Sequence, residues 1–165
     1  LLLTGKILTG RDAAHKKIVD LIKNKKPLPN GLDFTNKFIY YVGPVDPIND
    51  EVVGPAGPTT ATRMDKFVDE ILSNTGLIGM IGKAERSLET NTVIKKHSSV
   101  YLIAVGGAAF LVSKAIKKSK IIAFEELGME AVYEFYVEDM PVTVAVDTYG
   151  ESIHQNGPNM WRKLN

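Results

Sequence analysis

Short apolar runs alternate with amphipathic segments along most of the chain, and this alternation predicts its secondary structure. The apolar runs, rich in β-branched and aromatic residues, predict strands at residues 1–8, 38–42, 77–81, 100–105 and 121–124. Apolar positions at helical spacing predict helices over about residues 11–26, 59–74, 89–96 and 107–118. Strands that alternate with helices in this way are typical of an α/β domain.

The later apolar runs predict how the sheet is covered and how it ends. Residues 100–105 are apolar throughout, which is the pattern of a strand covered on both faces. Residues 132–137 and 142–146 predict a final antiparallel pair. We therefore expect a three-layer, mixed-sheet α/β domain over residues 1–150. Residues 151–165 show too little apolar periodicity to assign and form a C-terminal tail in this interpretation.

Composition supports one folded domain and narrows the kinds of function. The 165 residues are 44% hydrophobic, enough for a single core. Twenty Lys and Arg against nineteen Asp and Glu leave a net charge of +1, which argues against a dedicated nucleic-acid binder. The longest apolar run, residues 100–112, is shorter than the roughly 18 to 20 residues of a membrane span. With no signal-peptide pattern after Leu1, we expect a cytoplasmic protein.

The sequence contains no cysteine, which excludes disulfides, thiol catalysis and an iron–sulfur cluster held by this chain's own thiolates. Charge is unevenly distributed as well. Residues 1–30 carry seven bases and two acids, whereas residues 121–153 carry eight acids and no Lys or Arg. Such runs indicate either a docking face or a solvated surface, and the pattern alone does not separate the two.

A first candidate site lies at the strand-to-helix junction of residues 9–15. A helix N-terminus offers unpaired N–H groups and partial positive charge, so Arg11 in the same turn predicts a clamp for a carboxylate or phosphate. The alternative is that Arg11 pairs with a nearby acid such as Asp12. We interpret His15, one turn further, as a structural imidazole.

A second candidate site lies at residues 54–65, where Pro58, Thr59 and Thr60 form a helix-start signature. Only one hydroxyl is needed for capping, so the other can meet a ligand, and Arg63 can point back over the same helix end. The alternative is a plain capped helix. The spacing of a Walker loop is absent, which disfavours a nucleotide phosphate.

A third candidate is Lys83, which directly follows a predicted strand at the edge where open α/β sheets bind ligands. The alternative is that Lys83 is only a solvated lysine in a loop. Gly106 and Gly107 precede another predicted helix and indicate either a backbone anion cradle or close packing.

Taken in order, five stretches resemble the β subunit, or C-terminal domain, of class I iron–sulfur fumarases and L-tartrate dehydratases. These stretches are residues 10–16, 41–44, 57–65, 81–83 and 126–132. The most specific is Gly-Pro-Thr-Thr-Ala-Thr-Arg-Met-Asp at 57–65, and residues 126–132 favour fumarase over tartrate dehydratase. The resemblance spans about residues 5–150. Two departures are visible, because Ala84 and Ala108 stand where the family usually has glycine and proline.

The resemblance implies a swivelling β/β/α domain that supplies half of an active site. It implies that Arg11, Arg63 and Lys83 hold the two carboxylates of malate or fumarate, that Thr60 also binds the substrate, beside the reacting carbons, and that Thr59 is the catalytic base. The four-iron four-sulfur cluster would be carried by a partner α subunit, so no cofactor or metal is expected on this chain. A homodimer within a larger assembly is a further expectation.

The resulting hypothesis is the β subunit of a hydro-lyase that reversibly hydrates fumarate to L-malate and is inactive without its α subunit. Two alternatives remain open at this point. The first alternative is an L-tartrate dehydratase β subunit. The second is a non-catalytic module that binds a dicarboxylate or another anion.

Overall fold

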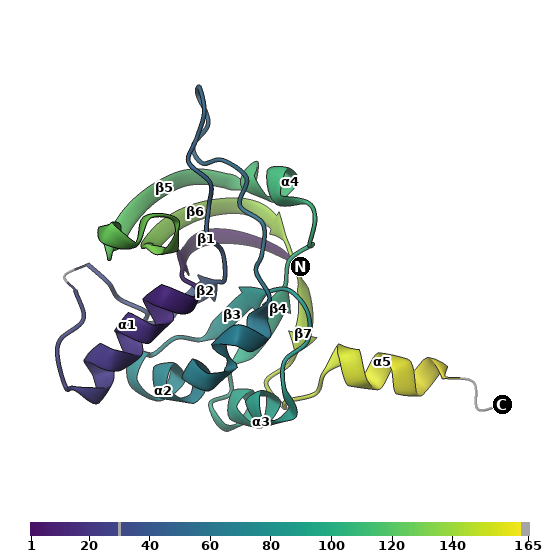
Figure 1. Ribbon diagram of the computed structural model, residues 1–165. Coiled ribbons are helices and arrows are strands. Elements are labelled where there is room, and N and C mark those ends of the chain that lie inside the picture. The colour runs from purple at the N-terminus through teal and green to yellow at the C-terminus, as the bar shows by residue number, and fades with distance from the viewer. Residues whose placement is uncertain (30, 163–165) are drawn as a thin grey trace.

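The computed structural model describes residues 1–29 and 31–162, which form one seven-stranded mixed sheet with helices packed on it (Figure 1). The strands are β1 (Leu2–Thr9), β2 (Phe38–Tyr40), β3 (Gly79–Gly82), β4 (Val100–Ile103), β5 (Ile116–Ala123), β6 (Val132–Pro141) and β7 (Thr143–Val146). The α-helices are α1 (Asp12–Lys23), α2 (Asp65–Thr75), α3 (Leu88–Lys96), α4 (Ala109–Ser113) and α5 (Ile153–Trp161). Two 3₁₀ helices, η1 (Ala61–Met64) and η2 (Glu125–Glu130), complete the fold.

The strand order is β5-β6-β1-β2-β3-β4-β7. The four central strands run parallel, with Leu8 opposite Ile39, Ile39 opposite Met80 and Met80 opposite Tyr101. Antiparallel strands close both sides, β6 and β5 next to β1 and β7 next to β4. The carboxyl ends of the parallel strands therefore meet along one edge of the sheet.

Alternate residues of the central strands point into two separate cores, as the pleat requires. Ile39 and Met80 pack with residues of α1 and α2 in the first core, and the helices α1, α2 and α3 cover this face (Figure 1). Tyr40 and Ile81 belong to the second core, which also takes residues from β1, β4, β5 and β6. Because six strands contribute to this second core, the sheet must curve around it, as Figure 1 shows for β5, β6 and β1. This curvature gives the expected layered α/β architecture.

The helix predicted over residues 107–118 is wrong. Only α4 is helical there, and β5 begins at Ile116 and ends at Ala123, so β5 includes residues 121–123 of the strand expected at 121–124. The apolar positions that suggested a helix face serve a different purpose: Val112 and Ile116 both enter the second core. Pairing of β5 with β6 outweighs the helix propensity of the lysine-rich stretch, whose charged side chains lie on an exposed edge strand.

The predicted antiparallel pair of residues 132–137 and 142–146 is also wrong. The two strands exist, but β6 lies between β1 and β5 while β7 pairs with β4 at the far side of the sheet. Both hydrogen-bonding edges of β6 are thus occupied by other strands. The β-branched residues correctly predicted that both segments are strands, whereas the pairing of each strand depends on partners distant in sequence.

The segment expected to be an unassigned tail contains α5, which extends away from the body of the domain (Figure 1). Every residue of α5 is at least partly exposed. None of the helices in the described part of the chain has the length and apolar character needed to cross a membrane.

Candidate active site

Arg11 occupies the N-cap position of α1, directly after β1 and Gly10. Its guanidinium lies against Gly43, where a Cβ would come within 2.9 Å of Arg11 Nη1, so only glycine leaves room for this approach. Two carboxylates face it: Arg11 Nε is 3.5 Å from Glu130 Oε1 and 3.8 Å from Asp12 Oδ2. Both distances suit ion pairing rather than a hydrogen bond, and within the described residues this buried Nε–H has no hydrogen-bond partner.

Glu130 is a site neighbour that sequence reasoning missed. Its Oε2 accepts a hydrogen bond from Ala13 N at 2.8 Å, so it satisfies one of the free N–H groups at the start of α1 from 117 residues away. The preference for an anion at a helix N-terminus explains this placement. Glu130 lies in the stretch 126–132 that carried the resemblance, which was the available signal.

Thr59, Thr60 and Arg63 lie at the start of η1, which leads into α2. Arg63 points back as expected, because its Nη2 donates a hydrogen bond to Thr59 Oγ1. The same Nη2 is 3.3 Å from Asp12 Oδ2. In the described structure neither threonine hydroxyl caps η1 or α2, so the prediction of a threonine cap is wrong. At the start of η1 the Ala61 N–H donates to Lys83 O instead, and both threonine side chains remain partly exposed.

Lys83 directly follows β3 and is joined to the threonine segment through the backbone. Lys83 N donates to Thr59 O and Ala61 N donates to Lys83 O, both at 3.1 Å, which forms a parallel bridge between Thr60 and Lys83. The Lys83 side chain is exposed. A Cβ on Gly106 would lie 3.6 Å from the Lys83 Cδ, an ordinary contact distance, so packing against Lys83 does not require glycine at this position.

The departure at Ala84 has a structural consequence. Ala84 adopts a φ of +64°, the left-handed region that favours glycine. Tyr101 Oη donates a hydrogen bond to Ala84 O at 2.9 Å, which holds this turn in place. The backbone after Lys83 therefore keeps a glycine-like conformation despite the alanine.

Three segments far apart in sequence thus meet at the carboxyl ends of β1, β2 and β3. Asp12 pairs with both Arg11 and Arg63, and Thr59 N donates to Tyr41 O, just after β2, at 2.7 Å. Arg11, Arg63 and Lys83 bring three cations to this edge, where Arg11 and Arg63 face the carboxylates of Asp12 and Glu130. Such an edge suits a small anion, and the end of an open α/β sheet is where ligands bind.

His15 has the structural role that the sequence favoured. It is buried beneath the site, and burial lowers its pKa from 6.5 to about 4, which keeps the imidazole neutral at neutral pH. Its Nδ1 lies 2.9 Å from Arg11 O. Because a carbonyl only accepts, Nδ1 carries the proton and donates to it. This hydrogen bond fixes the backbone from which the Arg11 side chain projects.

The residues of this chain do not fit an iron–sulfur cluster. Cluster irons are held mainly by cysteine thiolates, and the sequence has no cysteine. Across residues 1–29 and 31–162, no three His, Asp or Glu side chains are gathered in a way that could hold a metal ion.

Comparison with known proteins shows which family this chain resembles. The chain is 41% identical over 156 residues to "Fumarate hydratase class I, anaerobic" of Escherichia coli (strain K12), covering 94% of this chain and 28% of that protein. It is 39% identical over 155 residues to "Fumarate hydratase 2" of Leishmania major, covering 93% and 27%. It is 37% identical over 169 residues to "Putative L(+)-tartrate dehydratase subunit beta" of Methanocaldococcus jannaschii, covering 99% and 86%.

The chain therefore spans only 27–28% of the length of these two fumarate hydratases, but most of the length of the Methanocaldococcus protein. The family model "Fumarase C-terminus" matches residues 1–157. With nearly the whole chain matched, this protein belongs to the fumarase C-terminus family.

Proposed function

We propose that this chain is the dicarboxylate-binding β subunit of a hydro-lyase that reversibly hydrates fumarate to L-malate. The observation that carries the proposal is the meeting of Arg11 and Arg63 at Asp12, with Thr59 bonded to Arg63 and Lys83 attached to the same edge through the backbone. Membership in a family whose relatives are named fumarate hydratases supports the reaction class.

Binding would begin with an exchange of ion pairs. The Asp12–Arg63 pair is exposed to solvent on both sides, and such pairs contribute only about 0–1 kcal/mol, so a substrate carboxylate can replace Asp12 at little cost. Arg11, whose side chain is partly exposed, would offer its guanidinium to the same or the second carboxylate. Arginine forks bind carboxylates in two-point geometry, and Lys83 adds a point charge.

These cations would then stabilise the charge that develops during the reaction. Hydration adds a proton to one fumarate carbon, and dehydration removes it from the carbon next to a carboxylate, which concentrates negative charge on that carboxylate. Donors fixed in place before the reaction lower this barrier, and the loss of one typically costs about 100- to 1,000-fold in rate.

Thr59 is the residue we assign to the proton transfer. In the hydration direction its hydroxyl gives the proton to carbon, and in the reverse direction the resulting alkoxide takes it back. An alcohol is a poor acid, and the Arg63 guanidinium bonded to Thr59 Oγ1 favours the ionised form. The residues for the other half of the reaction, including the ligands of a four-iron four-sulfur cluster, would come from a partner α subunit.

A tartrate dehydratase β subunit is the second candidate function. It is favoured by the Methanocaldococcus relative, which is named as a tartrate dehydratase β subunit and of which this chain covers 86%. L-Tartrate also has two carboxylates and loses water in the same manner, so the same cations would serve it. The two candidates differ in the substrate hydroxyls rather than in the clamp.

The test is reconstitution without oxygen. Co-expression with a cluster-bearing partner encoded beside this chain should give a complex that hydrates fumarate, or dehydrates L-tartrate in the second case, while the chain alone should be inactive. Diacid binding by the complex with no turnover of either substrate would contradict the hydro-lyase proposal and leave an anion-binding module.

Thr59→Ala tests the assigned proton transfer in the same complex. We expect a rate loss of about 100-fold or more with KM for the diacid little changed, because the hydroxyl acts on the carbon and not on the carboxylates. Thr60→Ala is the neighbouring control. Near wild-type turnover of Thr59→Ala would move this role to Thr60 or to a partner residue.

A further inference from the structure

Arg86 is a charged residue buried beneath the candidate site, and it plays no part in the function argued so far. Its side chain is fully buried. Its Nε donates to Asp65 Oδ1 at 2.6 Å, and its Nη1 donates to Tyr41 Oη at 3.3 Å. The guanidinium also faces the rings of Tyr41 and Tyr101, with Cζ 5.4 and 4.9 Å from their centroids. Burial of a charge is costly, so its presence here calls for a reason.

Each partner of Arg86 belongs to a different segment of the site. Asp65 begins α2 two residues after Arg63, and Tyr41 O accepts the hydrogen bond from Thr59 N. Tyr101 Oη donates to Ala84 O, next to Lys83. Burial raises the pKa of Tyr41, so its hydroxyl stays protonated and remains an acceptor for Arg86. One guanidinium therefore touches the structures that hold Thr59, Arg63 and Lys83.

The Asp65 carboxylate completes this connection. Its Oδ1 accepts from Arg86, and its Oδ2 accepts from Ser87 N at 3.0 Å. The start of α2 is thereby bonded twice to residues 86–87, which follow the left-handed turn at Ala84. A turn in a disfavoured conformation keeps its shape only when surrounding contacts hold it, and Asp65 and Arg86 supply two of these contacts.

We propose that Arg86 is a positioning residue, which with Asp65 fixes the Lys83 turn against the Thr59–Arg63 segment so that the two sides of the diacid clamp keep one spacing. Arg86 does not touch the substrate in this proposal. The fork of the guanidinium is essential, because it bonds Asp65 and Tyr41 at once while its Cζ stays near the rings of Tyr41 and Tyr101, in a fixed planar geometry that an ammonium group lacks. The expected effect on turnover rests on the proposed function, whereas the expected effect on the Lys83 turn does not.

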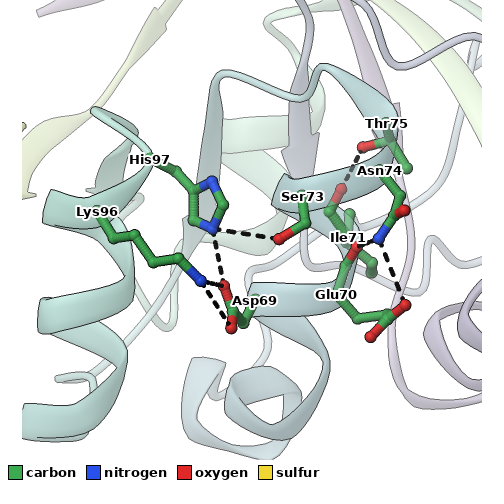
Figure 2. A network of polar contacts seen from close by, with 8 residues as sticks. All are labelled: Asp69, Glu70, Ile71, Ser73, Asn74, Thr75, Lys96 and His97. Atoms are coloured by element: carbon green, nitrogen blue, oxygen red, sulfur yellow. Dashed lines mark hydrogen bonds and ion pairs between the residues drawn. The ribbon is translucent and has the colours of Figure 1, made fainter.

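A second acidic residue on α2 provides a matched control. Asp69 lies one turn after Asp65, and its Oδ1 is 2.7 Å from His97 Nε2 and 2.9 Å from Lys96 Nζ at the end of α3 (Figure 2). Ser73 Oγ is 3.4 Å from the same His97 nitrogen. This network also joins α2 to α3, but Asp69 is half exposed and no proposed site residue takes part in it.

The experiment compares Arg86→Lys with Asp69→Asn in the full chain, by hydrogen exchange of single amides and by kinetics of the assembled enzyme. We expect Arg86→Lys to speed exchange of the Lys83 and Ala61 amides, which form the bridge between the two segments, while exchange in β1 and β6 stays as in the wild type. We expect KM for the diacid to rise and kcat/KM to fall by about 10- to 100-fold, since a small misplacement of binding groups has effects of this size. Asp69→Asn should change neither readout.

Tyr101→Phe provides a second test if Arg86→Lys fails to fold. It removes only the hydrogen bond to Ala84 O, so we expect faster exchange at Lys83 and a rise in KM, smaller than for Arg86→Lys. The proposal is overturned if a folded Arg86→Lys, or in its absence Tyr101→Phe, keeps wild-type exchange at Lys83 and Ala61, or if Asp69→Asn alters that bridge equally. A wild-type complex inactive on both diacids would contradict the proposed function instead, and the exchange comparison would still decide the role of Arg86.

Discussion

Two aspartates of this chain meet arginines in opposite surroundings. Asp12 lies at the sheet edge, 41% exposed, with Arg11 and Arg63 at 3.8 and 3.3 Å. Asp65 is 15% exposed, binds a fully buried Arg86 at 2.6 Å and also accepts from Ser87 N. We call the contacts of Asp12 with Arg11 and Arg63 the outer pair, and the contact of Asp65 with Arg86 the inner pair.

The contrast between them separates two uses of the same chemistry. A loose, solvated pair is weak and can exchange its carboxylate for that of a ligand. A buried pair with short hydrogen bonds cannot exchange, because either partner left alone would be an uncompensated charge in the interior. The outer pair is thus suited to binding and the inner pair to holding the binding groups at a fixed spacing.

The largest expected effect is on stability, from breaking the inner pair. Asp65→Ala leaves the Arg86 guanidinium buried without its carboxylate, and we expect a loss of about 3–5 kcal/mol in the free energy of unfolding. Urea denaturation of the full chain measures it. Asp69→Ala, which breaks the exposed network on the same helix, should cost no more than about 1 kcal/mol. Equal losses in the two variants would contradict the argument that burial makes the inner pair costly to break.

The next effect is on catalysis, from removing a cation of the outer pair. Arg63→Ala should lower the hydration rate of the assembled enzyme by about 100-fold or more, because it removes a donor for the developing charge and the hydrogen bond to Thr59. Lys66→Ala, an exposed cation three residues further on, is the control. Unchanged turnover would exclude Arg63 from the site.

A third effect is on the pH dependence of stability and involves His15, which lies between the two pairs and packs edge-on against Tyr41 at 5.2 Å between ring centroids. Its folded pKa of about 4 lies below the ordinary 6.5, so between these values the unfolded chain binds more protons. Stability therefore falls as pH drops through this range, by about 2 kcal/mol from pH 7 to 5.

His15→Gln should remove most of this pH dependence, and denaturation curves at several pH values measure it. Above about pH 5 carboxylates are still ionised and contribute little. His97→Gln is the control for replacing a histidine, because His97 lies away from both pairs, in the Asp69 network of Figure 2. A His15→Gln chain with the wild-type slope would show that another group causes it.

The site was predictable from the sequence where its signals are local. Arg11, Thr59 and Lys83 each stand within a few residues of a strand or helix end, and glycine or proline marks the turn beside them. The ends of parallel strands share an edge, which brings these three segments together, and the family resemblance joined the three local signals into one candidate site. Glu130 and Arg86 were not predictable in this way, since their partners lie 117 and 21 residues away.

The same reasoning explains where the predicted fold departs from the structure. Central strands with both faces covered are apolar throughout and were identified from their composition. The stretch 116–123 has one exposed edge and three lysines, so its pattern of apolar and polar residues also fits a helix. Its pairing with β6 is what makes it a strand. The partners of β6 and β7 depend on long-range register, which a single sequence does not encode locally.

The smallest expected effect tests the exchange of the outer pair itself. In Asp12→Asn the carboxylate that competes for Arg63 loses its charge, so the diacid no longer displaces an ion pair on binding. We expect KM to fall by about twofold to fivefold and the free energy of unfolding to change by less than about 1 kcal/mol, both in the range of an exposed ion pair. Asp20→Asn, exposed on the same helix, should change neither value. A rise in KM would mean that Asp12 orients the arginines rather than competing for them, and the outer pair would then resemble the inner one.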